Sequence, residues 1–209
     1  MKLLLRTVIA IAISIFYPIF AFSTTITGEF TFNKKAPKGV LIYVVGDTSL
    51  NQPTIIDQKN NQFVQPIVVG KKGTNVQFVN SDTINHNVYA DDKKKNVNFD
   101  IGLALPGSSF EERITWEEGE LVRISCKIHP KMRAWVGSMS SKHFQILTFE
   151  RKQKQASFVI EGVPSGLQTI RVVIPGYDEI TTEINVGNTV TVDVNRKKKK
   201  RGTMKLQRS

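Results

Sequence analysis

The chain has 209 residues, a formal net charge of +11, 40% hydrophobic residues and one cysteine, which excludes an internal disulfide. Lys2 and Arg6 supply two of the positive charges, and eight basic residues from Arg196 onward supply eight more, with no acidic residue in either stretch. The remaining body carries only +1, so the charge argues against a nucleic-acid-binding protein.

The first residues are typical of a secretion signal. Lys2 and Arg6 form a basic start, residues 7–20 are largely apolar, and Ala21-Phe22-Ser23 matches a small-x-small cleavage site. The pattern predicts a signal peptide over 1–23, cleavage near Ser23/Thr24 and a periplasmic or secreted protein. An uncleaved anchor is the alternative, although the apolar stretch is short for a spanning helix.

The rest of the chain predicts an all-β protein. Short runs rich in β-branched and aromatic residues alternate with Gly, Asn, Asp and Pro, without a sustained helical period. The expected strands are 26–32, 39–45, 54–57, 65–69, 75–80, 86–90, 110–114, 119–125, 133–138, 144–149, 157–161, 166–174, 180–186 and 189–194. Their spacing favours β-sandwiches. A polar run at 151–155 marks either a domain boundary or an exposed turn.

Four residues form a candidate metal site. Cys126, His129 and Met132 lie in Cys-Lys-Ile-His-Pro-Lys-Met, and His86 lies upstream in Asn-His-Asn-Val-Tyr. One thiolate, two imidazoles and a thioether are the ligands of a blue-copper centre. A buried structural cysteine is the alternative for Cys126, but the neighbouring His129 and Met132 argue against it.

Two segments of this region resemble the cupredoxins. Residues 75–89 are similar to the first-histidine region of plastocyanin-like domains, and Gly119 to Val136 is similar to their ligand loop. The Cys-x-x-His-x-x-Met spacing is the short form found in amicyanins. The resemblance spans roughly residues 52 to 138, and it implies a Greek-key sandwich holding one copper ion that cycles between Cu(I) and Cu(II).

The same resemblance assigns roles to individual residues. It implies that His86, Cys126, His129 and Met132 bind the copper ion. It also implies that Asn87 braces the ligand loop and tunes the thiolate. From its own chemistry, Pro130 is expected to stiffen that loop because its ring fixes one backbone angle.

Three basic residues accompany the candidate ligands. Lys127, Lys131 and Arg133 are expected to form a ring that attracts an acidic redox protein and raises its encounter rate. The alternative is that they only solvate the loop. The expected partners therefore include an acidic protein and exclude nucleic acid.

The flanking segments resemble a second module. Residues 157–177 are similar to the second half of carboxypeptidase-regulatory-like modules, and 26–30 with 39–44 are similar to their opening strands. We therefore expect 24–46 and 144–195 to form one discontinuous sandwich of the Ig or prealbumin kind. The copper domain at 47–143 would be inserted within it. In the alternative, linear order, the N-terminal hairpin extends the copper domain.

Residues 196–209 are expected to form a basic tail. Such a tail would contact an anionic membrane surface or an acidic partner, or would simply be a solvated end. The combination of the two modules resembles exported bacterial proteins labelled methylamine-utilisation proteins, a label from which no methylamine chemistry follows.

These observations predict an exported mononuclear blue-copper protein that transfers single electrons. No Gly-x-Ser-x-Gly elbow, phosphate-cradling glycine loop or paired carboxylate motif is present, so the chain is not expected to be an enzyme. One alternative is copper binding for storage or delivery without electron transfer. The other is an envelope scaffold or adhesion module.

Overall fold

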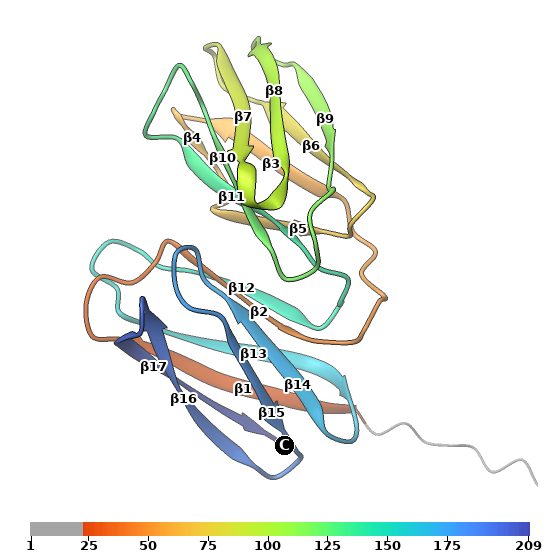
Figure 1. The fold of residues 1–209 in the computed structure, drawn as a ribbon, viewed down its shortest axis with the longest axis vertical. Coiled ribbons are helices and arrows are strands. Elements are labelled where there is room, and N and C mark those ends of the chain that lie inside the picture. Colours follow the sequence, from red (N-terminus) through yellow and green to blue (C-terminus); the bar gives the residue numbers. More distant parts are fainter. Residues whose placement is uncertain (1–22) are drawn as a thin grey trace, which may run out of the picture.

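The computed structural model describes residues 23–209, which form two stacked β-sandwiches (Figure 1). The all-β prediction is confirmed, because the only helical element among these residues is a short 3-10 turn at Lys93–Lys95. None of the described helices is long and apolar enough to cross a membrane. The signal peptide predicted over 1–23 lies outside the described residues, apart from Ser23.

The upper sandwich in Figure 1, here called the site sandwich, carries the candidate ligands. One sheet has the order β5-β11-β10-β7-β8 and the other the order β4-β3-β6-β9. The strands are β3 (Thr54–Lys59), β4 (Gln62–Phe63), β5 (Ile67–Gly70), β6 (Asn75–Asn80), β7 (His86–Asp92), β8 (Val97–Ala104), β9 (Ser109–Arg113), β10 (Leu121–Ser125) and β11 (Arg133–Ser138). Inward-facing residues of both sheets, such as Phe78, Ile124 and Val136, form one core.

The lower sandwich, here called the flanking sandwich, contains segments from both ends of the chain. Its sheets have the orders β13-β1-β17-β16 and β12-β2-β14-β15. The strands are β1 (Ser23–Phe32), β2 (Gly39–Val44), β12 (Phe144–Thr148), β13 (Gln155–Pro164), β14 (Gln168–Val173), β15 (Ile180–Ile184), β16 (Thr189–Arg196) and β17 (Lys199–Arg208). The chain leaves this sandwich after β2, builds the site sandwich and returns at β12. The polar run at 151–155 connects β12 to β13, so it is no domain boundary.

Strand β2 joins the two sandwiches because both of its faces are buried. Val40, Ile42 and Val44 belong to the core of the flanking sandwich. Leu41 and Tyr43 point the other way, into a separate apolar cluster with Ile67, Val69 and Met139. The near-continuous apolar sequence Gly-Val-Leu-Ile-Tyr-Val is what burial on both faces requires.

The two sandwiches are also closely packed where the chain crosses between them. A side chain at Gly39 would place its Cβ 2.9 Å from the Cδ1 atom of Ile67, so the first residue of β2 lies directly against β5. The carboxylate of Asp47, in the outgoing connection, accepts a 2.8 Å hydrogen bond from the backbone N–H of Lys142 in the returning one. These contacts fix the two sandwiches relative to each other.

The prediction of a basic tail at 196–209 is wrong. Residues 199–208 form β17, which pairs with β1 on one side and β16 on the other. Met204, Leu206 and Arg208 alternate into the core, whereas Lys205 points outward. This alternation is the signature of a half-buried strand, and the preceding lysines obscured it.

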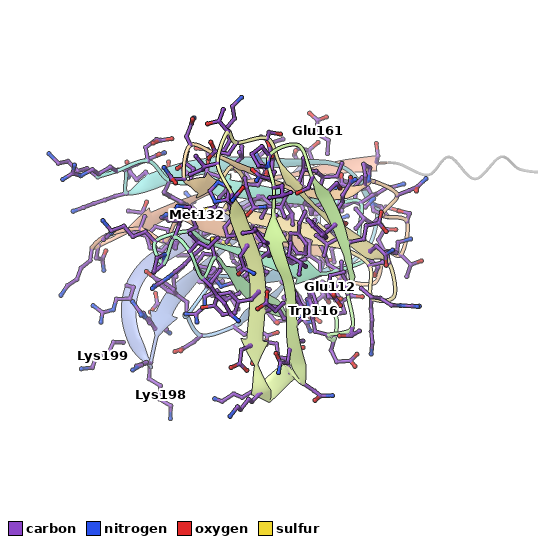
Figure 2. The ribbon with its side chains drawn as sticks, turned by 90° about the horizontal axis from the view of Figure 1, so that it is seen from above. Glu112, Trp116, Met132, Glu161, Lys198 and Lys199 are labelled. Carbon is purple, nitrogen blue, oxygen red and sulfur yellow. The ribbon has the colours of Figure 1, made fainter. Side chains whose placement is uncertain are left out.

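The β16–β17 turn is basic and exposed. Lys197 and Lys198 both adopt positive φ angles, 51° and 60°, as the two central residues of a tight hairpin do. Lys198 and Lys199 extend away from the body of the protein in Figure 2.

Candidate metal centre

The three strongest candidate ligands lie at the ends of two neighbouring strands of the five-stranded sheet and in the loop that follows one of them. His86 begins β7, Cys126 directly follows β10, and His129 lies in the connection from β10 to β11, here called the ligand loop (126–132). Both His86 and Cys126 are buried, whereas the His129 side chain is half-buried. Because β7 and β10 pair at Tyr89 and Ser125, the sheet brings residues forty positions apart to one end of the sandwich.

The donor atoms of these residues converge. The Nδ1 atoms of His86 and His129 are 3.1 Å apart, and the Sγ atom of Cys126 is 3.8 Å from His129 Nδ1. All three donor atoms lie within 4.8 Å of one another. Metal–ligand bonds of about 2.0–2.3 Å place such donors roughly 3.3–3.8 Å apart. The arrangement therefore fits a single metal ion.

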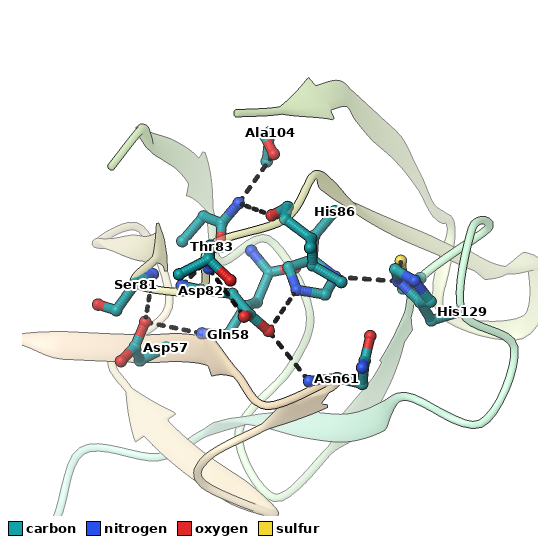
Figure 3. Close-up of polar contacts among 12 residues, drawn as sticks. Asp57, Gln58, Asn61, Ser81, Asp82, Thr83, His86, Ala104 and His129 are labelled. Carbon is teal, nitrogen blue, oxygen red and sulfur yellow. Dashed lines mark hydrogen bonds and ion pairs between the residues drawn. The ribbon is translucent and has the colours of Figure 1, made fainter. Parts of the chain in front are cut away.

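His86 is held from behind by Asp82 (Figure 3). Its Nε2 atom lies 3.0 Å from Oδ2 of Asp82, and the same oxygen accepts a 3.0 Å hydrogen bond from the backbone N–H of Asn61. The pKa of Asp82 is lowered to about 2, first by the Asn61 hydrogen bond and next by His86. An ionised carboxylate accepts a hydrogen bond from Nε2–H of His86. The proton therefore stays on Nε2, which leaves Nδ1 free to bind metal.

Local sequence explains this support. Asn60 and Asn61 have φ angles of 54° and 57° and form the tight β3–β4 hairpin, which directs the Asn61 N–H toward Asp82. Buried Asn80 accepts a 3.0 Å hydrogen bond from the Asp82 N–H and donates to the carbonyls of Ile84 and Ala104. The β6–β7 turn is thereby fixed around the histidine.

Asn87 connects β7 to the ligand loop. Its Oδ1 atom accepts a 3.2 Å hydrogen bond from the backbone N–H of Lys127, the residue after Cys126. Its Nδ2 atom donates to Oδ1 of Asp100 at 2.6 Å and to the Gly102 carbonyl at 2.8 Å. The hydrogen bond from the Lys127 N–H thus links Asn87 to the ligand loop, as a bracing role for Asn87 requires.

Asp100 completes that network from β8. Lys127 donates a 2.5 Å hydrogen bond to Oδ2 of Asp100, and this contact is the largest cause that lowers the pKa of Asp100 to about 2. The predicted docking residue Lys127 is therefore already paired. Lys131 and Arg133 are exposed and take part in no ion pair within residues 23–209.

Met132 and Pro130 lie where the sequence places them, in the ligand loop before β11. Met132 is 1% exposed, and its backbone N–H donates a 2.9 Å hydrogen bond to the His129 carbonyl. Pro130, by contrast, is exposed. The third histidine, His143, lies at the junction between the sandwiches, where its Nδ1 atom is 3.2 Å from the Glu161 carbonyl.

Exposed apolar side chains surround the same end of the sandwich. Ile84 precedes His86 by two residues, Ile128 precedes His129, and Leu103 pairs with Asn87 across β8. Leu105 follows Ala104, the partner of His86. These four side chains are 39–54% exposed, and we call them the apolar rim.

Asp82, Asp100 and the apolar rim were not predicted as parts of the site. An aspartate four residues before a candidate histidine ligand was the available signal for Asp82. Asp100 carried no such signal, because its strand β8 was not expected. Apolar residues do alternate along β8, but Asn98, Asp100 and Gly102 at the positions between them are all disfavoured in strands.

Comparisons with known proteins give similarity to solved structures only. No family model and no curated protein matches the chain. A purple cupredoxin from Nitrosopumilus maritimus matches 41% of this chain and 99% of its own, with 22% identity and a TM-score of 0.36. Amicyanin from Paracoccus versutus matches 47% of this chain and 97% of its own, with 21% identity and a TM-score of 0.35.

A copper-containing enzyme is also among the similar structures. The Cu-containing nitrite reductase from Thermus scotoductus matches 46% of this chain at 22% identity, with a TM-score of 0.38. The chain spans only 25% of that protein.

Proposed function

We propose that this chain is an exported protein that binds one copper ion and carries single electrons between redox partners. The observation that carries the proposal is the convergence of His86 Nδ1, His129 Nδ1 and Cys126 Sγ within 4.8 Å. One thiolate with two imidazoles suits copper, and the ligand loop also carries the buried Met132, whose thioether belongs to a blue-copper set and not to an ordinary zinc set.

Bound copper would supply a one-electron couple. The chain's own contribution is to hold the donors in place before the metal arrives. Asp82 orients His86, Asn87 fixes the backbone beside Cys126, and burial keeps water away from the thiolate. A site that is already ordered changes little between oxidation states, which favours rapid electron exchange.

The half-buried His129 is the proposed route for the electron. It directly follows Ile128 of the apolar rim, where a partner could exclude water on docking. Periplasmic or secreted location and the acidic redox partner remain part of this proposal.

Voltammetry of the copper-loaded chain tests the function. We expect a reversible one-electron couple together with fast self-exchange, seen as line broadening when Cu(I) and Cu(II) forms are mixed in an NMR sample. A colourless, tightly held Cu(I) form that resists oxidation would instead indicate copper storage or delivery. A chain that binds zinc but no copper would contradict both functions.

Asp82→Asn is expected to weaken copper binding by about 10–100-fold, because a neutral amide oxygen accepts the hydrogen bond from His86 Nε2–H more weakly than a charged carboxylate does. Loss of the negative charge also disfavours Cu(II) relative to Cu(I), so the reduction potential should rise. Competition titration and voltammetry measure the two effects.

Asp57→Asn is the matched control. Asp57 lies near Asp82 in Figure 3 and accepts hydrogen bonds from the backbone of Gln58 and Ser81, but it has no contact with His86. The control should leave the potential close to that of the wild type. Equal shifts in the two variants would show that Asp82 acts only through its charge and does not orient His86.

A further inference from the structure

A groove runs along the junction between the ligand loop and the flanking sandwich. It has a volume of about 760 Å³. The site sandwich contributes Pro130, Lys131, Arg133 and Trp135. The flanking sandwich contributes the β1–β2 loop from Lys35 to Lys38, together with Pro175, Tyr177 and Arg196. The β1–β2 loop and the ligand loop lie on the same side of the molecule, at the left in Figure 1.

The groove is strongly basic. Five of its residues are cationic and none is acidic: Lys35, Lys38, Lys131, Arg133 and Arg196. None of the five takes part in an ion pair within residues 23–209. Like charges gathered in a concave surface repel one another and concentrate their field, so they favour an anionic occupant.

The walls of the groove are apolar and aromatic. Trp135 is half-buried against the apolar cluster of the junction, and the guanidinium of Arg196 lies 5.8 Å from the ring centre of Tyr177. Its shape is fixed before any ligand binds, because the cluster and the close Gly39–Ile67 contact hold the two sandwiches together. Little ordering of the protein is therefore required on binding.

We propose that this groove binds an acidic segment of the protein that exchanges electrons with the metal centre. Pro130 and Lys131 directly follow His129, so an occupant of the groove contacts the loop that holds three of the four candidate ligands. A membrane surface is flat and fits a concave groove poorly, whereas an extended acidic peptide fits it. The redox identity of the partner rests on the proposed function, and the acidic chemistry of the occupant rests on the groove alone.

The proposal corrects the docking surface expected from the sequence. Lys127 is paired with Asp100 on the other side of the ligand loop and does not line the groove. Lys131 and Arg133 act instead with Lys35, Lys38 and Arg196 from the second sandwich. This gives the flanking sandwich a role in partner choice.

The test uses the copper-loaded full chain and a fluorescein-labelled oligoglutamate peptide, with binding followed by fluorescence anisotropy at low ionic strength. Lys35→Glu combined with Lys38→Glu is expected to weaken binding about tenfold or more, because two cations of the groove become anions. Both lysines are exposed, so the fold and the metal centre should be unaffected.

The control is Lys71→Glu combined with Lys72→Glu, which makes the same change in net charge. These exposed or half-buried residues follow β5 at Gly70, which pairs with Ser138 at the end of β11 away from the ligand loop. The control should weaken binding about twofold or less at this distance, because salt screens exposed charges. Equal losses in the two double variants would overturn the groove as the binding site.

Two further outcomes separate the alternatives. If dextran sulfate binds and depends on Lys35 and Lys38 while the peptide does not, the occupant is an anionic polysaccharide and the proposal is wrong. If the peptide depends on both lysines but the chain shows no thiolate-to-copper absorption, the acidic occupant stands and the electron-transfer function fails.

Discussion

Cys126→Ala is expected to abolish the intense visible absorption of the copper-loaded protein, because that absorption requires a thiolate bonded to copper. Cys126 is the only cysteine in the chain, so no other residue can replace its sulfur. Its side chain is 1% exposed and lies 3.8 Å from His129 Nδ1. The two histidines alone should hold Cu(II) weakly and without the strong colour.

The same variant separates metal binding from folding. Removing one buried sulfur atom costs the metal-free protein about 1 kcal/mol, so Cys126→Ala should still fold. Copper at a hundredfold excess over its dissociation constant should stabilise the wild type by about 2.7 kcal/mol and the variant by far less. Calorimetric melting with and without copper measures the difference.

His143→Gln is the control for this prediction. His143 is the one histidine outside the cluster, and its contacts are with Glu161 and the Asp47 connection. Its replacement should leave the absorption intact. Loss of the absorption in His143→Gln, or its survival in Cys126→Ala, would contradict the assignment of Cys126 as a ligand.

Arg208→Ala is expected to lower the free energy of unfolding by about 3 kcal/mol, because several buried oxygens lose a charged donor at once. The Arg208 side chain is fully buried, although it takes part in no ion pair within residues 23–209. It donates to the hydroxyl of Thr24 at 2.8 Å and to the backbone carbonyls of Pro164, Gly166 and Ile184. Its pKa is lowered because burial disfavours the charged form.

These hydrogen bonds tie together the two ends of the flanking sandwich. Thr24 is the second residue of β1 and Arg208 is the last residue of β17, so their contact joins these two paired strands near both ends of the described chain. For a chain of this length, a loss of 3 kcal/mol corresponds to a fall in melting temperature of roughly 6–12 °C. Scanning calorimetry of the metal-free protein measures it.

Two variants bracket the effect. Arg208→Lys keeps the charge but cannot reach four acceptors, so it should recover only part of the stability. Arg201 lies in the same strand, and its Nε atom has no hydrogen-bond partner within residues 23–209. Arg201→Ala should therefore lower the free energy of unfolding by less than about 1 kcal/mol. A fall for Arg208→Ala no larger than that for Arg201→Ala would show that the buried hydrogen bonds add little.

Most of the strands and the four candidate ligands followed from the sequence because their signals are local. Period-two alternation identifies a half-buried strand, and the ligand loop holds three candidate ligands within seven residues. The strands that were missed have weaker local signals. The β4 strand has only two residues, the alternation of β8 includes Asn98, Asp100 and Gly102, which are disfavoured in strands, and lysines obscured the alternation of β17.

The supporting contacts and the groove depend on tertiary structure. The Asn61 N–H meets Asp82 only because the β3–β4 hairpin lies beside the β6–β7 turn. Lys35 and Lys131 share one groove although nearly the whole site sandwich separates them in the chain. No local pattern encodes such meetings, since they depend on the return of the chain to the flanking sandwich.

We expect His86, Cys126 and His129 to hold one copper ion through their two imidazoles and one thiolate. Titration of the metal-free full chain with Cu(II), followed by visible absorption and EPR, measures this. We predict an intense thiolate-to-copper band that saturates at one ion per chain, with narrow copper hyperfine splitting. Saturation without that band, or with the wide splitting of ordinary Cu(II) sites, would contradict it.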